Sequence, residues 1–136
     1  MITAVDTNVL LDVFTADNRF GPRSTTALRA CLREGRVLAC DVVWTETASL
    51  FPSTDAARVA MASLGVEFEP VSLDATLDAA TAWRAYREGG GRRERVVADF
   101  LIGAHARRHA ERLLTRDRGF YRRYFGGLPV LDPSRA

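Results

Sequence analysis

The sequence predicts a single α/β domain, an α/β/α sandwich whose short parallel central sheet is covered by helices on both faces. Short apolar runs alternate with longer stretches of helical periodicity, a pattern typical of parallel sheets. The 136 residues, 47% of them hydrophobic and 26% charged, suffice for one compact core. No linker is long enough to divide the chain, so we expect one domain over residues 1–136.

Short apolar runs ending at polar residues predict the strands. We expect strands over residues 2–5, 37–40, 66–71, 113–115 and 129–131. The first ends at Asp6, and the fourth ends just before Arg116. Apolar and acidic residues alternate between Val66 and Val71, which is typical of a strand at the edge of a sheet.

Helical spacing and helix-breaking residues predict the intervening helices. We expect one helix directly after Asp6, further helices over residues 24–32, 42–51, 55–64, 74–87 and 96–112, and a short one between 116 and 125. Thr7 and Asn8 supply helix-capping chemistry at the start of the first helix. Pro52 and Gly65 close the third and the fourth, since proline cannot continue the hydrogen-bond ladder and glycine is a weak helix former.

The charged and sulfur-containing residues exclude several classes of protein. All 19 basic residues are arginine, which rules out Schiff-base, P-loop and general-base lysines. The formal net charge of +2 does not by itself indicate nucleic-acid binding. Cys31 and Cys40 are too few for a disulfide framework, so we expect reduced thiols and a cytoplasmic location. We expect neither a signal peptide nor a membrane span.

Four acidic residues follow or begin the predicted elements at one edge of the sheet: Asp6, Glu46, Asp99 and Asp117. Functional groups of open parallel sheets gather beyond the carboxyl ends of the strands. A single acid there is most simply a helix cap or a solvated side chain. Four carboxylates that converge repel one another and call for a hard divalent cation with oxygen ligands, Mg²⁺ or Mn²⁺.

Three blocks of sequence resemble the PIN-domain nucleases. They are Val5 to Asp12 (VDTNVLLD), Val97 to Ala106 (VADFLIGAHA) and Leu113 to Phe120 (LLTRDRGF). The segment from Gly127 to Pro133 (GLPVLDP) resembles the end of VapC-type toxins. Taken in order and at these intervals, the blocks are specific, and the resemblance spans nearly the whole chain.

The resemblance implies a Mg²⁺-dependent endoribonuclease, the toxin of a bacterial toxin–antitoxin pair, with Mn²⁺ as a substitute. The family's acidic quartet corresponds to the four acids named above, with Asp6 and Asp99 as principal metal ligands. Asn8 and Thr115 match polar positions that support the acids and the substrate. The match of Glu46 is the least secure, and Asp12 and Asp41 remain alternatives to it.

The resemblance also implies partners: an RNA substrate, a cognate antitoxin protein and a second copy of the chain, with a larger assembly once the antitoxin binds. Arginines beside the acids are candidates for RNA or antitoxin contact, because guanidinium groups bind phosphates in bidentate fashion. These arginines are Arg92, Arg93, Arg95, Arg116 and Arg118.

Other functions are weighed against the nuclease. A non-catalytic RNA-binding PIN-like module would lack an acid, and a deoxyribonuclease would use the same metal site. A phosphatase with an aspartate nucleophile requires a second aspartate where Asn8 stands, and usually a lysine. His105 and His109 have the spacing of a zinc pair, but Ala106 replaces the glutamate of a metalloprotease helix.

Overall fold

The computed structural model describes residues 1–91 and 95–135, and five strands of these residues form one parallel sheet. The strands are β1 (Ile2–Val5), β2 (Arg36–Ala39), β3 (Val66–Phe68), β4 (Arg112–Leu114) and β5 (Val130–Leu131). Their order is β3-β2-β1-β4-β5, and every pairing of neighbours is parallel. The predicted parallel sheet is thus confirmed, and so is the edge position of the third strand.

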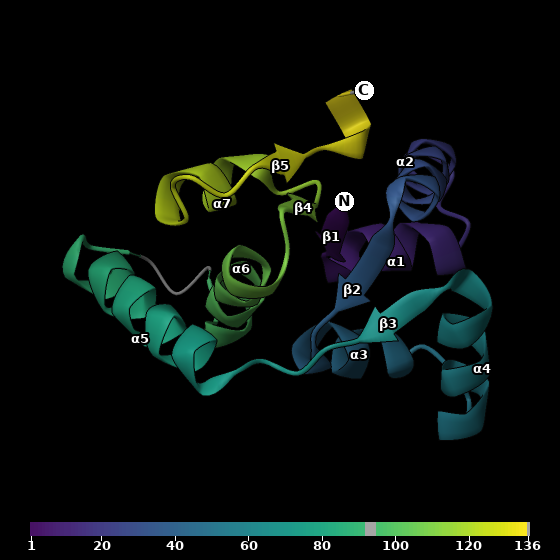
Figure 1. Cartoon of the computed structure of the whole chain (residues 1–136), viewed down its shortest axis with the longest axis horizontal. Coiled ribbons are helices and arrows are strands. Elements are labelled where there is room, and N and C mark those ends of the chain that lie inside the picture. The colour runs from purple at the N-terminus through teal and green to yellow at the C-terminus, as the bar shows by residue number, and fades with distance from the viewer. Residues whose placement is uncertain (92–94, 136) are drawn as a thin grey trace.

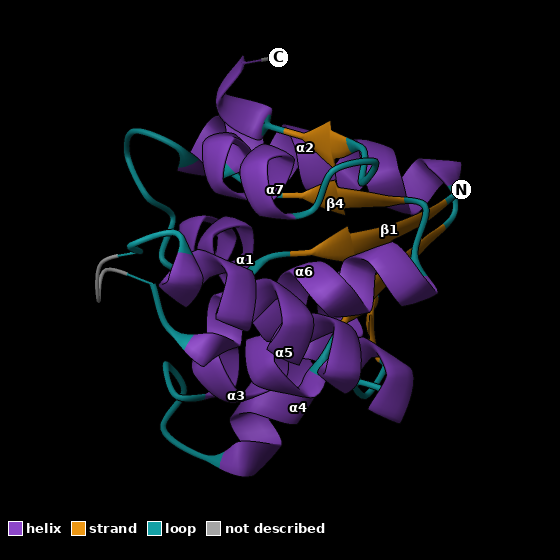
Figure 2. Ribbon diagram, turned by 90° about the vertical axis from the view of Figure 1, so that its left-hand side faces the viewer, coloured by secondary structure: helices purple, strands orange, loops and turns teal. Residues whose placement is uncertain are grey.

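Helices flank the sheet (Figures 1 and 2). They are α1 (Thr7–Phe14), α2 (Gly21–Glu34), α3 (Asp41–Ala48), α4 (Thr54–Leu64), α5 (Leu73–Glu88), α6 (Val97–His109) and α7 (Arg118–Tyr124), with a short 3-10 turn η1 (Pro133–Arg135). The closest helix pairs are α5 with α6 and α1 with α2. Among the described residues, none of the helices combines the length and the apolar character that crossing a bilayer requires.

The strand order makes the carboxyl ends of β1 and β4 the switch point of the sheet, and we call this place the crevice because open α/β sheets bind ligands there. From β1 the chain proceeds through β2 to β3 on one side, and it then returns to place β4 and β5 on the other side. Val5 pairs with Leu114, and the Asp6 N–H donates to the Leu114 carbonyl oxygen at 2.9 Å, so the two strands end together. At such a switch point the following segments diverge and leave room for a ligand.

Several predicted boundaries are wrong for identifiable reasons. The helix expected from Ser24 begins at Gly21, because a proline is accommodated in the first turn. The helix expected to reach Arg112 ends at His109, and Arg112 instead belongs to β4. Its guanidinium donates to the Thr3 hydroxyl at 2.9 Å and to Glu34 at 2.7 Å, which ties the strand to its surroundings.

An aromatic cluster closes the core beside α6. Phe100 is fully buried, and its ring lies 5.2 Å from that of Trp83 and 5.1 Å from that of Phe120, both edge-on. This packing anchors the first turns of α6 and α7 to each other. Cys31 and Cys40 are buried free thiols, as predicted.

Candidate active site

Asp6 stands directly after β1, at the switch point of the sheet. The structure makes it the N-cap of α1, since its Oδ1 accepts the Thr7 N–H at 2.7 Å. Thr7 and Asn8, the expected caps, lie inside the helix. The other carboxylate oxygen, Oδ2, accepts hydrogen bonds from the Thr115 hydroxyl (2.8 Å), the Tyr121 hydroxyl (3.1 Å) and the Asn8 amide (3.3 Å). Oδ2 is therefore saturated, whereas Oδ1 accepts one hydrogen bond in the described part of the chain and keeps accepting capacity.

Burial dominates the ionisation of Asp6. The residue is 6% exposed, and burial raises the pKa of its carboxyl to about 6. Hydrogen bonds from Thr115, Thr7 and Tyr121 oppose this rise in pKa, while the charge of Asp99 adds to it. Because the folded-state pKa exceeds the unfolded value of 3.8, Asp6 contributes stability below pH 3.8 that is lost as the pH rises through 6. The cost of the bare anion is about 3 kcal/mol.

Asp99 stands in the first turn of α6. Its Oδ2 accepts the Val96 N–H at 3.3 Å. Burial raises the pKa of Asp99, and the charges of Asp117 and Glu46 raise it further, against the Val96 N–H and the Arg95 guanidinium, which lower it. Shared hydrogen-bond partners bring three of the acids together, since Thr7 contacts both Asp6 and Glu46 and Thr115 contacts both Asp6 and Asp117, and the charge of Asp99 acts on Asp6.

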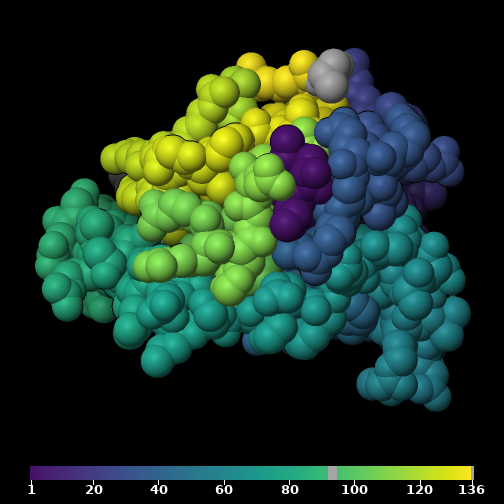
Figure 3. All heavy atoms as spheres, viewed as in Figure 1, coloured from purple at the N-terminus to yellow at the C-terminus, as the bar shows by residue number. Residues whose placement is uncertain are grey.

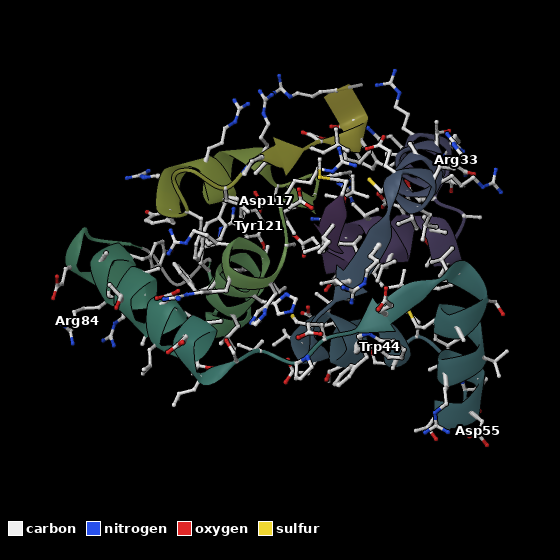
Figure 4. The ribbon with its side chains drawn as sticks, viewed as in Figure 1. Arg33, Trp44, Asp55, Arg84, Asp117 and Tyr121 are labelled. Atoms are coloured by element: carbon white, nitrogen blue, oxygen red, sulfur yellow. The ribbon has the colours of Figure 1, made fainter. Side chains whose placement is uncertain are left out.

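Glu46 and Asp117 are the other two acids, and each accepts a hydrogen bond from a partner within the chain. Glu46 lies exposed on α3, and its Oε1 accepts the Thr7 hydroxyl at 2.7 Å. Asp117 caps the start of α7, and its backbone N–H donates to the Thr115 hydroxyl at 3.0 Å. The Arg95 guanidinium binds the Asp117 carboxylate in bidentate fashion. In the view of Figure 4, Asp117 lies beside Tyr121, between α6, α7 and β1.

The acids suit a hard cation by their chemistry. Within residues 1–91 and 95–135, no three acidic, histidine or cysteine side chains form a ready-made metal cluster. Arg95 holds Asp117, and Thr7 holds Glu46. The donor set consists of carboxylates, which Mg²⁺ and Mn²⁺ prefer. The buried charge of Asp6 gives such a cation a physical reason to bind.

Asp12, an alternative to Glu46, has another partner. Both of its oxygens accept from Arg116, at 2.7 Å from Nε and 3.1 Å from Nη2, and Oδ2 also accepts the Ser24 hydroxyl at 2.7 Å. The carboxylate is 4% exposed and is satisfied by these bonds. Asp41, the other alternative, begins α3 and accepts the Val71 N–H at 3.2 Å. Of the three, Glu46 is the one whose charge acts on Asp99.

The predicted substrate contacts have different surroundings. The Arg116 guanidinium binds Asp12, and its backbone N–H donates to the Asn8 side-chain oxygen at 3.1 Å. Arg118 begins α7 beside Asp117. Arg92 and Arg93 lie outside the described residues. The substrate-binding role of these four arginines remains a prediction.

The roles of two side chains of the site were not predicted from the sequence. Tyr121 is 1% exposed, and burial together with the charge of Asp6 raises its pKa well above the usual value, so it serves as a fixed hydrogen-bond donor. Its position one helical turn after Asp117 is the signal that could have indicated it. Thr7 serves as the hydrogen-bond partner of Glu46 as well as a helix residue.

We expect Tyr121→Phe to raise the pKa of Asp6 above 6, because the lost hydroxyl stabilises the charged carboxylate. The free energy of unfolding should fall by about 1 kcal/mol at pH 7.5. The fall should be smaller at pH 4.5, where Asp6 is protonated in the fold. NMR titration of the Asp6 carboxyl carbon and chemical denaturation measure both effects. Tyr124→Phe, on the same helix, is the matched control, and an equal effect there would refute the role of Tyr121.

Comparison with known proteins places this geometry in a family context. The profile of the PIN domain matches residues 3–126. Comparison with curated protein sequences gives no match. Among solved structures, VapBC2 from Rickettsia felis bound to a promoter DNA fragment shares 17% identity, with 97% of this chain and 98% of that chain covered and a TM-score of 0.74.

Two further structures have the same fold. A toxin–antitoxin complex from Klebsiella pneumoniae shares 22% identity over 96% of this chain and 97% of that chain, with a TM-score of 0.69. VapC20 from Mycobacterium tuberculosis, described as a toxin that cleaves the sarcin–ricin loop, shares 19% identity over 82% and 86% of the two chains, with a TM-score of 0.58. At these identities the likeness establishes a shared fold, and it agrees with the α/β/α architecture described above.

Proposed function

This chain belongs to the PIN domain family, and from that premise we propose that it is a metal-dependent endoribonuclease, the toxin of a toxin–antitoxin pair. The observation that carries the proposal is that Thr7 contacts both Asp6 and Glu46 and Thr115 contacts both Asp6 and Asp117, beyond the ends of β1 and β4, while the charge of Asp99 acts on Asp6. The fold shared with VapC20, a toxin that cleaves RNA at the sarcin–ricin loop, supports RNA as the substrate.

Asp6 and Asp99 would hold Mg²⁺ or Mn²⁺, with Glu46 and Asp117 beside them. A bound ion of this kind supplies an acidified water and positive charge against a phosphodiester. Within the chain, Asn8, Thr115 and Tyr121 fix Asp6 by binding its Oδ2, and Oδ1 would be the oxygen that holds the ion. The Thr115 hydroxyl also receives the Asp117 N–H, so one side chain sets the positions of two acids.

The proposal includes protein partners. Toxin–antitoxin complexes among the matched structures support an antitoxin that binds this chain. An acidic crevice attracts a basic segment, and an antitoxin arginine placed there would compete with the cation for the carboxylates. We also propose that the chain forms a homodimer in the cytoplasm, which joins a larger assembly when the antitoxin is bound.

Cleavage by the purified, antitoxin-free chain tests the function. Matched RNA and DNA oligonucleotides and total RNA are incubated with Mg²⁺, with Mn²⁺ or with a chelator. Cleavage of RNA alone that stops with the chelator supports the proposal, and equal cleavage of DNA would replace it with a nuclease indifferent to the sugar. No cleavage together with no Mn²⁺ binding would instead favour a non-catalytic binding module.

We expect Mn²⁺ to raise the melting temperature, and to raise it less at low pH. At 100 times the Kd, binding stabilises the fold by about 2.7 kcal/mol, roughly 10 °C for a domain of this size. Protonation of Asp6, whose pKa is about 6, should weaken binding about tenfold at pH 5 and remove roughly half of that shift. Thermal denaturation at pH 7.5 and pH 5 measures this. A shift independent of pH would place the ion away from Asp6.

A further inference from the structure

A basic pocket lies at the edge of the sheet that also bears the acids. It has a volume of about 510 Å³ and is lined by Arg19, Phe20, Arg23, Ser134 and Arg135. The lining residues contribute three guanidinium groups and no carboxylate. This is a concentration of positive charge in a chain whose formal net charge is only +2.

Two segments far apart in the sequence build the pocket. The start of α2 packs against η1, the turn that follows β5 (Figures 1 and 3). Arg23 Nη1 donates to the Ser134 carbonyl oxygen at 2.7 Å and joins the two segments. Because all strands are parallel, the end of β5 opens to the same edge of the sheet as Asp6 and Thr115 do. The pocket and the acids therefore share one edge.

The guanidinium groups retain capacity for an anion. Arg23 uses one amino group on a carbonyl oxygen. Arg135 has a carboxylate neighbour, Asp132, but at 3.8 Å, and its side chain is 66% exposed. Asp132 is already satisfied by Ser134, whose N–H and hydroxyl donate to Oδ1 at 2.9 and 2.6 Å. Arg19 lies over the Phe20 ring at 4.8 Å, with no carboxylate partner in the described part of the chain.

Phe20 connects the pocket to the acidic crevice. The Arg116 guanidinium lies 4.0 Å from the centre of the Phe20 ring, and Arg116 stands between Thr115 and Asp117 in the chain. Asp12 holds this guanidinium in place through two hydrogen bonds. Phe20 and Arg116 thus join the pocket to the segment that carries Thr115 and Asp117.

We propose that this pocket binds the phosphodiester backbone of the RNA strand next to the cleaved bond. The inference rests on the proposed function and adds to it a second anion site, which holds the substrate at a distance from the metal. Guanidinium forks match phosphate oxygens, and the pocket volume lies in the range of ligand sites, large enough for a nucleotide. An acidic crevice repels a polyanion, so a separate basic site has a clear physical purpose.

Binding measured without turnover tests the pocket. The full chain carrying Asp99→Asn is titrated with a fluorescein-labelled 12-nucleotide single-stranded RNA over a series of salt concentrations. Arg19→Gln, Arg23→Gln and Arg135→Gln are combined in one variant. We expect affinity at 100 mM salt to fall by about 10- to 100-fold, and the slope of log K against log salt to flatten by about 2, at roughly 0.7 per phosphate contact. Arg33→Gln, at the other end of α2 and labelled in Figure 4, is the matched control and should change affinity less than twofold.

A lysine version separates charge from folding. Replacing the same three arginines by lysine keeps the charge, so the salt slope should return while affinity recovers only in part. An unchanged slope in the glutamine variant overturns the proposal, and so does a wild-type chain that binds no RNA. Competition by polyglutamate that depends on the three arginines, while RNA affinity does not, would make the pocket a site for an acidic protein instead.

The outcome is independent of catalysis. RNA binding through the pocket without cleavage by the wild-type chain would refute the proposed nuclease and keep the pocket. If the wild-type chain cleaves RNA with a metal ion and the glutamine variant has the same kcat/KM, the nuclease is supported and the pocket is refuted. Where both hold, we expect kcat/KM to fall with affinity while kcat at saturating RNA stays within about twofold, because the pocket touches no reacting atom.

Discussion

Replacing Asp99 by asparagine is expected to reduce RNA cleavage by more than about 100-fold without unfolding the protein. Loss of a metal-binding carboxylate exceeds the 10- to 100-fold cost typical of losing a group that merely supports one. The fold should tolerate the change, because the residue is only half-buried and the asparagine oxygen can still accept the Val96 N–H.

The same substitution should also change the pKa of Asp6 and the melting temperature. The charge of Asp99 raises the pKa of Asp6. Its removal should therefore lower the Asp6 pKa below 6, and the melting temperature near neutral pH should stay equal or rise. A conventional loss of packing would lower it. NMR titration of Asp6 and thermal denaturation distinguish these cases in the metal-free protein.

Asp55→Asn is the matched control for Asp99→Asn. Asp55 also stands in the first turn of a helix, but on α4, where it is exposed and pairs with Arg58. It lies far from the crevice (Figure 4). Cleavage and Mn²⁺ affinity should match the wild type in this variant. Full cleavage by the Asp99 variant would remove Asp99 from the site, and an equal loss in both variants would indicate a general effect of charge.

The place of Asp6 could be predicted because it depends on local sequence. An apolar run that ends in an acid, as Val5 precedes Asp6, places that acid at the carboxyl end of a buried strand. A parallel sheet then gathers such residues at one edge. The helix boundaries were predicted less well, since packing decides them. Arg112 joins β4 through contacts with Thr3 and Glu34, both distant in sequence.

The partners of the acids could not be predicted from the sequence. Tyr121 binds Asp6 across 115 positions of the chain, and the bonds from Arg116 to Asp12 span 104. Composition and periodicity say nothing about such pairs, because a guanidinium beside an acidic motif has the same sequence pattern whether it binds RNA or another side chain. Arg95, considered for RNA or antitoxin contact, is placed against Asp117 in the fold.

We therefore expect substitutions of Asp12 and Glu46 to have opposite effects on stability and on Mn²⁺ affinity. Asp12→Asn should lower the free energy of unfolding by about 3 kcal/mol, because it leaves the half-buried Arg116 charge without its partner. It should leave the Mn²⁺ affinity of the folded protein nearly unchanged. Glu46→Gln should do the opposite. Its exposed side chain still accepts the Thr7 hydroxyl, so stability should change by less than about 0.5 kcal/mol.

The loss of charge in Glu46→Gln should weaken Mn²⁺ binding about tenfold, since Glu46 acts on Asp99 across the crevice. Chemical denaturation in chelator gives the stabilities, and calorimetric titration gives the affinities. If Asp12→Asn weakened Mn²⁺ binding while leaving stability intact, Asp12 would be the ligand and its pairing with Arg116 would have to open for the cation. The expected pattern would show that the two acids have different partners. Asp12 binds Arg116 and thereby holds the turn with Thr115 and Asp117 against α1. Glu46 leaves its charge for the metal.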